Sequence, residues 1–279
     1  MKLHLTLNQA QGSIIPINYQ YPLASGIYKI IAQGNADYAS FLHEHAYKKE
    51  GSLKAFKLFT FSDLRSPFQI QGDRLLLCSK ESIVDVCFHI PDAATHFVRG
   101  LFVDQVIEIA DRKSKARFDI AQVEVVPLWD EPLAARTSKQ VLLRPLSPMV
   151  IGRKNVRGYS DYLSPHDSDF IAGLIFSWKE KYATVYGSAQ AEADFASLSV
   201  RVIGKENTRS RLITIKEGSP EETKVRGFLG FSLEVQALVE VLELALNAGI
   251  GMNCSMGFGC VGLVRLEENY YIYSHRIEE

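Results

Sequence analysis

The feature that most constrains the fold is a run of fourteen residues near the end of the chain that contains five glycines, from Gly249 to Gly262. Apolar residues at helical spacing precede the run over 235–248, and an apolar strand pattern follows it at 261–264. Glycine has no Cβ, so its backbone adopts positive φ and approaches a neighbour or a ligand closely. Backbone N–H groups gathered in such a loop suit an anion such as phosphate. We therefore expect a helix, a glycine-rich loop and a strand, with a polyanion as one candidate ligand.

Three of these glycines, Gly257, Gly259 and Gly262, match the dinucleotide-binding pattern G-x-G-x-x-G. That pattern requires a strand before it and a helix after it, so that the pyrophosphate lies at the helix N-terminus. Here the expected order is helix, loop, strand. No Gly-Lys-Ser/Thr ends the run, so a nucleotide P-loop is excluded as well. The remaining structural interpretation is a helix C-cap followed by a tight turn.

Composition limits which ligands the protein is expected to bind and in which cellular compartment it is expected to lie. The formal net charge is −1, so binding to a polyanion would need a local basic patch. The four cysteines form no C-x-x-C pair, and we expect neither a metal site nor a disulfide framework, nor any cofactor. The first residues alternate like a strand and resemble no signal peptide, and no apolar run reaches the ~20 residues of a membrane span. We expect a cytoplasmic protein without a membrane partner.

The pattern of apolar residues predicts the same element order twice. The first half reads as a strand at 2–7, helices at 23–32 and 36–47, strands at 56–62, 67–71, 73–78 and 83–90, a helix after Pro91 and a strand pair within 104–126. A polar segment at 129–140 reads as a linker. The second half reads as a strand at 140–151, a helix at 167–186, hairpin strands over 195–217 and 223–234, a helix at 235–248 and the final strand. We predict an α+β protein of two ferredoxin-like domains, 1–130 and 140–279, each ordered β-α-β-β-α-β.

Helical phase predicts which aromatic and histidine residues of the first two helices lie on the buried face and which lie off it. Tyr28 is displaced by roughly 140° from Leu23 on the first buried stripe, and His43 by roughly 140° from Tyr38 on the second. His45 falls on the second apolar stripe, so we predict that it is packed or half-buried. On phase alone, His43 is an ordinary surface histidine.

Basic residues provide two further candidates for functional sites, one lysine and one cluster. Lys57 stands at the start of an otherwise apolar strand, where a lysine also serves to prevent edge-to-edge aggregation. The densest basic cluster spans the predicted hairpin, where one face of a β-ribbon could contact phosphates. A solvated hairpin without a ligand is an equally good interpretation. The cluster comprises Arg201, Lys205, Arg209, Arg211 and Lys216.

Four blocks of sequence together resemble the CRISPR-associated repeat-cleaving endoribonucleases, the sixth-named Cas family of the repeat-associated mysterious protein (RAMP) superfamily. The blocks are Gly26-Ile27-Tyr28, Phe41-Leu42-His43-Glu44, Lys57-Leu58-Phe59-Thr60-Phe61-Ser62 and Ser255-Met256-Gly257-Phe258-Gly259. Weaker agreement comes from Leu146-Ser147-Pro148 and Asp169-Phe170. The resemblance follows the whole chain in order, and it implies tandem RRM-like domains of the RAMP type.

The resemblance also implies an activity, in which a CRISPR precursor transcript is cleaved within each repeat without a metal. The products carry a 2′,3′-cyclic phosphate and a 5′-hydroxyl. By position in the blocks, the catalytic residues are Tyr28, His43 and Lys57, which would supply an acid, a base and a cation for the phosphorane. Which of Tyr28 and His43 acts as base stays open. Lys57 is assigned to charge stabilisation.

The implied RNA-binding residues lie in the second half of the chain. They are Gly249, Gly251, Gly257 and Gly259 of the glycine-rich loop, and Arg201, Lys205, Arg209 and Arg211 of the basic hairpin. The implied partner is CRISPR repeat RNA, together with possible subunits of a CRISPR effector complex or a second copy of the chain. The alternative is a non-catalytic RNA-binding RAMP subunit of such a complex. The Tyr28–His43–Lys57 set favours the enzyme.

Overall fold

The structure is a computed structural model that describes residues 1–49, 51, 52, 54–156 and 160–264. Its first half is built on a five-stranded antiparallel sheet in the order β5-β8-β1-β10-β9. The strands are β1 (Lys2–Asn8), β5 (Phe59–Phe61), β8 (Glu81–Phe88), β9 (Val106–Ala110) and β10 (Lys115–Val126). Alternation explains the sheet, because Leu3, Leu5 and Leu7 of β1 are fully buried while their neighbours are partly exposed.

Helices α1 (Gln20–Gly34), α2 (Ala36–Glu44) and α3 (Pro91–Leu101) accompany this sheet. The predicted stripe of α1 is confirmed, since its leucine and isoleucines are fully buried in the first core. Two glycines let α1 and α3 cross closely: a Cβ on Gly34 would lie 1.9 Å from the carbonyl oxygen of His96, and one on Gly100 would lie 1.8 Å from that of Ile30. Any side chain at either position would separate the helices.

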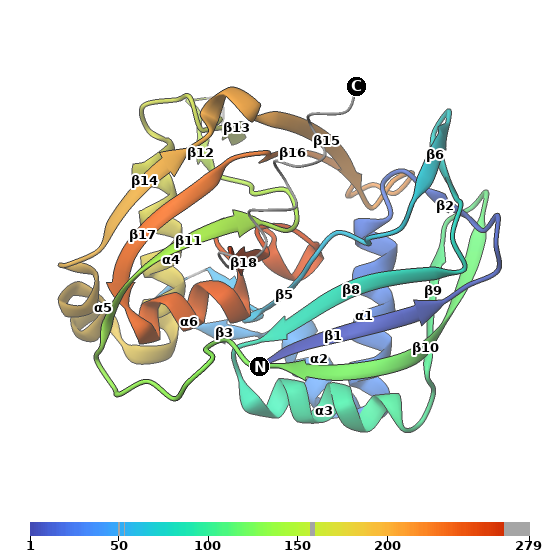
Figure 1. Cartoon of the computed structure of the whole chain (residues 1–279), viewed down its shortest axis with the longest axis horizontal. Helices are drawn as coiled ribbons and strands as arrows, with labels where there is room; N and C mark the ends of the chain where they lie inside the picture. The colour runs from blue at the N-terminus through green and yellow to red at the C-terminus, as the bar shows by residue number, and fades with distance from the viewer. Residues whose placement is uncertain (50, 53, 157–159, 265–279) are drawn as a thin grey trace.

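The second half repeats the arrangement. Its antiparallel sheet has the order β14-β17-β11-β18, and its first strand, β11, lies between β17 and β18 just as β1 lies between β8 and β10. The strands are β11 (Ser138–Pro145), β14 (Ser199–Ile203), β17 (Ser232–Leu238) and β18 (Val261–Leu263), with helices α4 (Phe170–Tyr186), α5 (Ser188–Phe195) and α6 (Val239–Ala248). Figure 1 shows the two large sheets side by side. The predicted tandem ferredoxin-like fold is confirmed, and the division at 1–130 and 140–279 stays our proposal, with 265–279 outside the described residues.

Short strands decorate this framework. One small sheet has the order β2-β7-β6, and three pairs join β3 with β4, β12 with β13 and β15 with β16. Their bounds are β2 (Ile14–Pro16), β3 (Tyr47–Lys48), β4 (Ala55–Phe56), β6 (Phe68–Gln71), β7 (Arg74–Leu77), β12 (Gly152–Lys154), β13 (Ser160–Tyr162), β15 (Arg209–Ile215) and β16 (Thr223–Leu229). Two 3₁₀ turns, η1 (Lys205–Asn207) and η2 (Cys254–Met256), complete the described elements.

The two halves are joined by specific contacts. Helix α6 packs against β8 and β5 of the first sheet. The amino group of Met1 donates hydrogen bonds to the carbonyl oxygen of Phe88 and to Oδ1 of Asn247 on α6. Leu58, although it precedes β5, is buried in the core of the second half. The junction of the halves is therefore a packed interface, and side chains held there have fixed surroundings.

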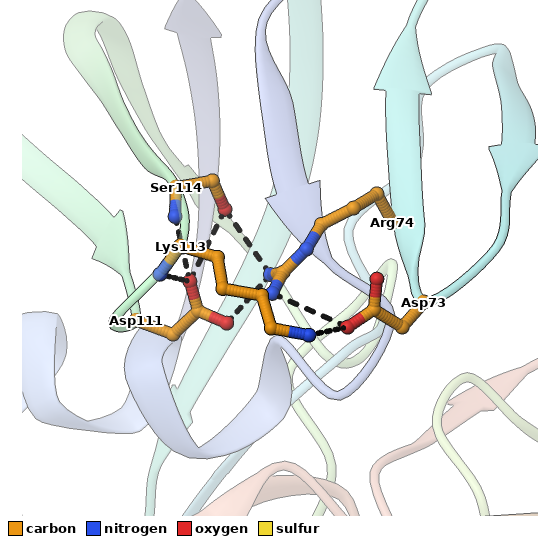
Figure 2. Close-up of polar contacts among 5 residues, drawn as sticks. All are labelled: Asp73, Arg74, Asp111, Lys113 and Ser114. Carbon is orange, nitrogen blue, oxygen red and sulfur yellow. Dashed lines mark hydrogen bonds and ion pairs between the residues drawn. The ribbon is translucent and has the colours of Figure 1, made fainter.

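Polar contacts also tie together three hairpin turns at the other end of the first sheet. Figure 2 shows the Arg74 guanidinium between the carboxylates of Asp111 and Asp73, at 2.5 and 3.4 Å, with Lys113 2.7 Å from Asp73. Next to them, the guanidinium of Arg112 donates to the carbonyl oxygen of Gly218 in the β15–β16 turn, at 3.2 Å. The β15–β16 hairpin of the second half is thereby fixed against the first half.

At three places the elements differ from those expected from the sequence. The strand expected at 56–62 is interrupted at Lys57 and Leu58, because Leu58 adopts a φ of 53°. The helix expected at 235–248 begins only at Val239, since 232–238 is strand β17 at the centre of the second sheet. Helix α5 was not expected at all. None of the helices among the described residues is long and apolar enough to cross a membrane.

Candidate active site at the junction of the two halves

Tyr28 and Lys57, two of the three predicted catalytic residues, are in contact. The Lys57 ammonium lies 4.7 Å from the centroid of the Tyr28 ring, and that ring packs edge-on against Phe59 at 5.3 Å. Tyr28 comes from the middle of α1, and Lys57 from the break between β4 and β5. The structure thus brings together residues 29 positions apart in sequence.

The break at Lys57 has a tertiary cause. Leu58 is 3% exposed and packs in the second core, whereas Phe59, the next residue, is fully buried in the first. The backbone must turn between them, and Leu58 takes the left-handed conformation that a branched side chain rarely adopts. Strain of this kind persists where surrounding contacts over-determine it. Lys57 is therefore held at the interface of the two halves.

Burial shifts both pKa values. It raises the pKa of Tyr28 well above the ordinary value near 10, and the nearby Ser255 side chain opposes part of that rise. The Tyr28 hydroxyl is buried and makes no hydrogen bond within the described residues. The pKa of Lys57 is lowered, first by burial and then by the charge of Lys216. At neutral pH the tyrosine thus remains a proton donor.

His43 lies on the exposed face of α2, as its helical phase predicts. Within the described residues, no hydrogen bond joins it to Tyr28 or Lys57. The prediction for His45 is wrong: its side chain is 69% exposed, because α2 ends at Glu44 and the helical phase does not continue to His45. The sequence argument that favoured His43 over a core-facing His45 therefore fails, and both histidines are accessible.

The glycine-rich loop adjoins this pair. Gly249, Gly251, Gly257 and Gly259 all have positive φ and are all buried. A Cβ on Gly257 would lie 2.6 Å from the ring of Phe61, so this glycine is required by packing against the first half of the chain. The half-buried residues of the loop are Met252, Asn253, Ser255 and Met256. The predicted RNA contacts of the glycines stay a prediction, and the loop's accessible atoms belong to their neighbours.

A buried lysine holds the start of this loop. Lys181, on α4, is 2% exposed, and its ammonium donates to the carbonyl oxygens of Ala248 and Gly249 at 3.0 and 2.6 Å. It also lies 3.2 Å from the sulfur of Cys254. A cation at the last carbonyls of α6 complements the negative end of the helix dipole. Lys181 therefore fixes where α6 ends and the loop begins.

A cleft of about 880 Å³ opens between the halves beside Lys57. One wall is the segment 54–59, the other is α4 with the β12–β13 hairpin, and the loop segment 251–256 closes the end. Its basic residues are Lys54, Lys57, Arg153, Lys154 and the buried Lys181, and its acidic residues are Asp169 and Glu180. The cleft thus combines a basic rim with an apolar lining that includes Phe56, Phe176 and Met256.

Comparison with known families identifies the chain. Residues 14–122 match the family model described as CRISPR-associated protein Cas6, N-terminal, and residues 130–263 match CRISPR associated protein Cas6, C-terminal. The two models follow one another and together span most of the chain. The chain belongs to the Cas6 family.

Curated relatives agree over nearly the whole length. The CRISPR-associated endoribonuclease Cas6 1 of Methanocaldococcus jannaschii is 23% identical over 94% of this chain and 92% of its own. The CRISPR-associated endoribonuclease Cas6 of Pyrococcus furiosus is 24% identical over 91% of this chain and 84% of its own.

Solved structures match the fold. A structure titled "Characterization of a Cas6-related gene from Pyrococcus furiosus" has a TM-score of 0.73 at 18% identity, covering 95% of this chain and 99% of that chain. One titled "An RAMP protein binding different RNA substrates" has a TM-score of 0.75 at 18% identity, covering 95% and 100%. These likenesses establish the tandem fold of this Cas6 family member.

The predicted basic ribbon is not one surface. Arg201 lies on β14 in the main sheet, where its guanidinium is 2.6 Å from Glu234, and Lys205 lies in η1. Only Arg209 and Arg211 are on β15, and Arg211 pairs at 2.6 Å with Asp63 of the first half. The basic residues are separated because β14 pairs with β17 in the main sheet, whereas β15 pairs with β16 in a separate hairpin. The prediction that this span forms one ribbon is wrong.

Several residues of the Cas6 cleft were not found from sequence. Lys54, Arg153, Lys154 and Phe176 are far apart along the chain, and no local motif marks them. Lys181 could have been suspected, because a lysine within an apolar helical stripe is unusual. Within the described part of the chain, no group of three or more His, Cys, Asp or Glu residues is arranged to hold a metal ion.

Proposed function

We propose that this protein is an endoribonuclease that cleaves CRISPR precursor RNA within its repeats, without a metal, to give mature guide RNA with 2′,3′-cyclic phosphate and 5′-hydroxyl ends. The observation that carries the proposal is the contact between Tyr28 and Lys57 beside the glycine-rich loop, in a member of the Cas6 family. The names of the two curated relatives support the activity.

The proposed reaction is a transfer at phosphorus. The 2′-oxygen of the nucleotide before the scissile bond attacks the adjacent phosphorus and loses its proton to a base. The bond between phosphorus and the 5′-oxygen breaks, and that oxygen takes a proton from an acid. A cation stabilises the charge that develops on the phosphorane oxygens. Three side chains suffice for these three functions.

The pKa directions support one distribution of the roles. Tyr28 keeps its proton at neutral pH, so it suits the acid or a hydrogen-bond donor better than the base. His43 is exposed, and an imidazole nitrogen accepts a proton from a hydroxyl, so we assign it the base. Lys57 acts as the cation, and burial of its ammonium strengthens its interaction with a phosphorane.

The substrate proposal follows from charge. RNA would lie against the basic rim of the cleft and the half-buried residues of the glycine-rich loop, with Arg209 and the outer face of the β15–β16 hairpin as further phosphate contacts. Gly249, Gly251, Gly257 and Gly259 would shape this surface. Association with effector subunits or a second copy, and a cytoplasmic location, remain part of the proposal, as does the absence of a cofactor.

Cleavage of the source organism's own repeat RNA in EDTA tests the proposal. His45→Ala is the matched control for His43→Ala, because both histidines are accessible and two residues apart. We expect a single cut by the wild type and by His45→Ala, and a rate at least about 100-fold lower for His43→Ala with RNA binding retained. The 3′ end of the product should resist phosphatase until acid opens the cyclic phosphate.

Other outcomes would redirect the proposal. Loss of cleavage in His45→Ala alone would transfer the histidine role to that residue. Tight binding without any cleavage by the wild type would instead favour the non-catalytic RAMP subunit.

A further inference from the structure

An exposed aromatic ring forms part of the wall of the cleft. Phe176 is 57% exposed, although Leu174 and Trp178, its neighbours on α4, are fully buried. The cleft it lines has an apolar floor that includes Ile151, Leu163 and Met252. A phenylalanine left exposed beside an apolar cavity indicates a ligand with a flat apolar part.

A cation lies over the same ring. The ammonium of Lys54, an exposed residue, is 4.5 Å from the centroid of Phe176. A planar group stacking on this face would displace the flexible Lys54 side chain. The freed ammonium would remain at the rim, within reach of a phosphate attached to that planar group. The pair therefore matches a ligand that is aromatic at one end and anionic at the other.

The charges around the cleft favour an anionic chain. Four basic residues line its accessible parts, against the two carboxylates of Asp169 and Glu180, and Arg153 forms an ion pair with Asp169. Lys57 of the proposed catalytic pair belongs to the same lining. A nucleotide bound here would thus be continuous with the RNA strand at the proposed cleavage site.

We propose that the cleft binds one unpaired nucleobase of the RNA substrate, stacked on Phe176, with its phosphate at Lys54. The proposal rests on the proposed function for the identity of the polymer. In an A-form duplex the base faces are stacked on one another, so a paired nucleotide cannot present its face to Phe176. The repeat must therefore be single-stranded at the nucleotide that enters the cleft, close to the scissile phosphate.

A binding cycle between protein and RNA variants tests this proposal. Repeat RNAs with one abasic nucleotide, moved position by position, are bound to His43→Ala protein so that they stay intact. At one position, loss of the base should weaken binding about tenfold, because stacking on an aromatic side chain contributes about that much. With Phe176→Ala added, the same abasic RNA should bind within about twofold of the intact RNA. Phe176→Trp should restore the tenfold difference.

Phe102→Ala is the matched control, because Phe102 is 83% exposed and lies after α3, outside the cleft. It should leave the abasic effect unchanged. The proposal is overturned if no position couples to Phe176, or if Phe102→Ala removes the effect equally. Because the cycle measures binding by protein without His43, its result is independent of whether the wild type cleaves RNA. Failure of the proposed function would appear instead as an uncleaved repeat with wild-type protein.

Discussion

Lys57 and Tyr28 depend on each other at the level of single side chains. The lysine ammonium lies over the tyrosine ring. Burial raises the pKa of the Tyr28 phenol, which therefore keeps its proton, and lowers the pKa of the Lys57 ammonium, which therefore loses its proton more readily. The same low-dielectric surroundings that shift these pKa values strengthen the attraction between Lys57 and an anionic transition state. The buried surroundings of Tyr28 and Lys57 therefore determine their proposed roles as much as their residue types do.

The rate of cleavage should fall as the pH rises through the lowered pKa of Lys57, since only the protonated ammonium stabilises the phosphorane. Lys216 is one cause of that lowering, so Lys216→Ala should raise the pKa and move the alkaline limb of the profile to higher pH. Single-turnover rates across the pH range measure this shift. Lys57→Ala should lower the rate about 100-fold at pH values below that pKa and should abolish this alkaline limb. An alkaline limb that Lys216→Ala leaves in place would show that another group controls it.

Tyr28→Phe should separate activity from stability. The ring contacts with Lys57 and Phe59 are kept, and the deleted hydroxyl is buried without a hydrogen bond, so the melting temperature should stay the same or rise. The cleavage rate should nevertheless fall by about 100-fold, because a proton donor is lost. Thermal unfolding and single-turnover cleavage give the two quantities. A variant that cleaves at the wild-type rate would remove Tyr28 from the mechanism.

At the scale of elements, Lys181 and the glycines position the loop. Lys181→Met keeps the length of the side chain but leaves the carbonyl oxygens of Ala248 and Gly249 without their donor. We expect a loss of about 2 to 3 kcal/mol in the free energy of unfolding, measured with urea. Lys179→Met on the same helix is the control, because its ammonium pairs with the exposed Glu192 and should contribute less than about 1 kcal/mol. Equal losses would contradict the role of Lys181.

The order of elements was predictable where periodicity was unambiguous, as in β1 and α1. It failed where a tertiary contact decided the outcome. No local sequence pattern indicates that Leu58 packs in the core of the second half, and this packing interrupts the strand. Val235 and Ala237 fit either a helix or a central strand, and pairing with β11 and β14 selects the strand. The cleft could not be predicted, because its residues converge only after the two halves pack.

At the scale of the whole molecule, His89 makes hydrogen bonds at the junction of the two halves. Its Nε2 lies 3.1 Å from the hydroxyl of Tyr186 on α4, and its backbone N–H donates to the carbonyl oxygen of Leu58. Burial lowers its pKa from 6.5 to about 4, helped by the charges of the N-terminal amino group and Lys181. The folded protein therefore keeps this histidine neutral at pH values where the unfolded chain protonates it.

Stability should therefore fall as the pH drops from about 6.5 to about 4, because the unfolded state takes up a proton that the folded state does not. The loss should amount to at most about 3 kcal/mol, and protonation of His89 should add nothing below that window. Urea unfolding at several pH values measures it. His89→Gln should flatten the dependence, whereas His166→Gln, at an exposed position, should not. Identical profiles for the two variants would exclude His89 as the cause.

Attack by a ribose hydroxyl is the central claim for the whole molecule, and a single atom of the substrate tests it. Wild-type protein is given repeat RNA in which the nucleotide before the cleavage site carries a 2′-deoxyribose. The account predicts that this RNA binds with nearly unchanged affinity and is not cut at that site, because the nucleophile is missing. Cleavage there at the rate of the all-ribose RNA would contradict it, since the attacking oxygen would then have to come from water.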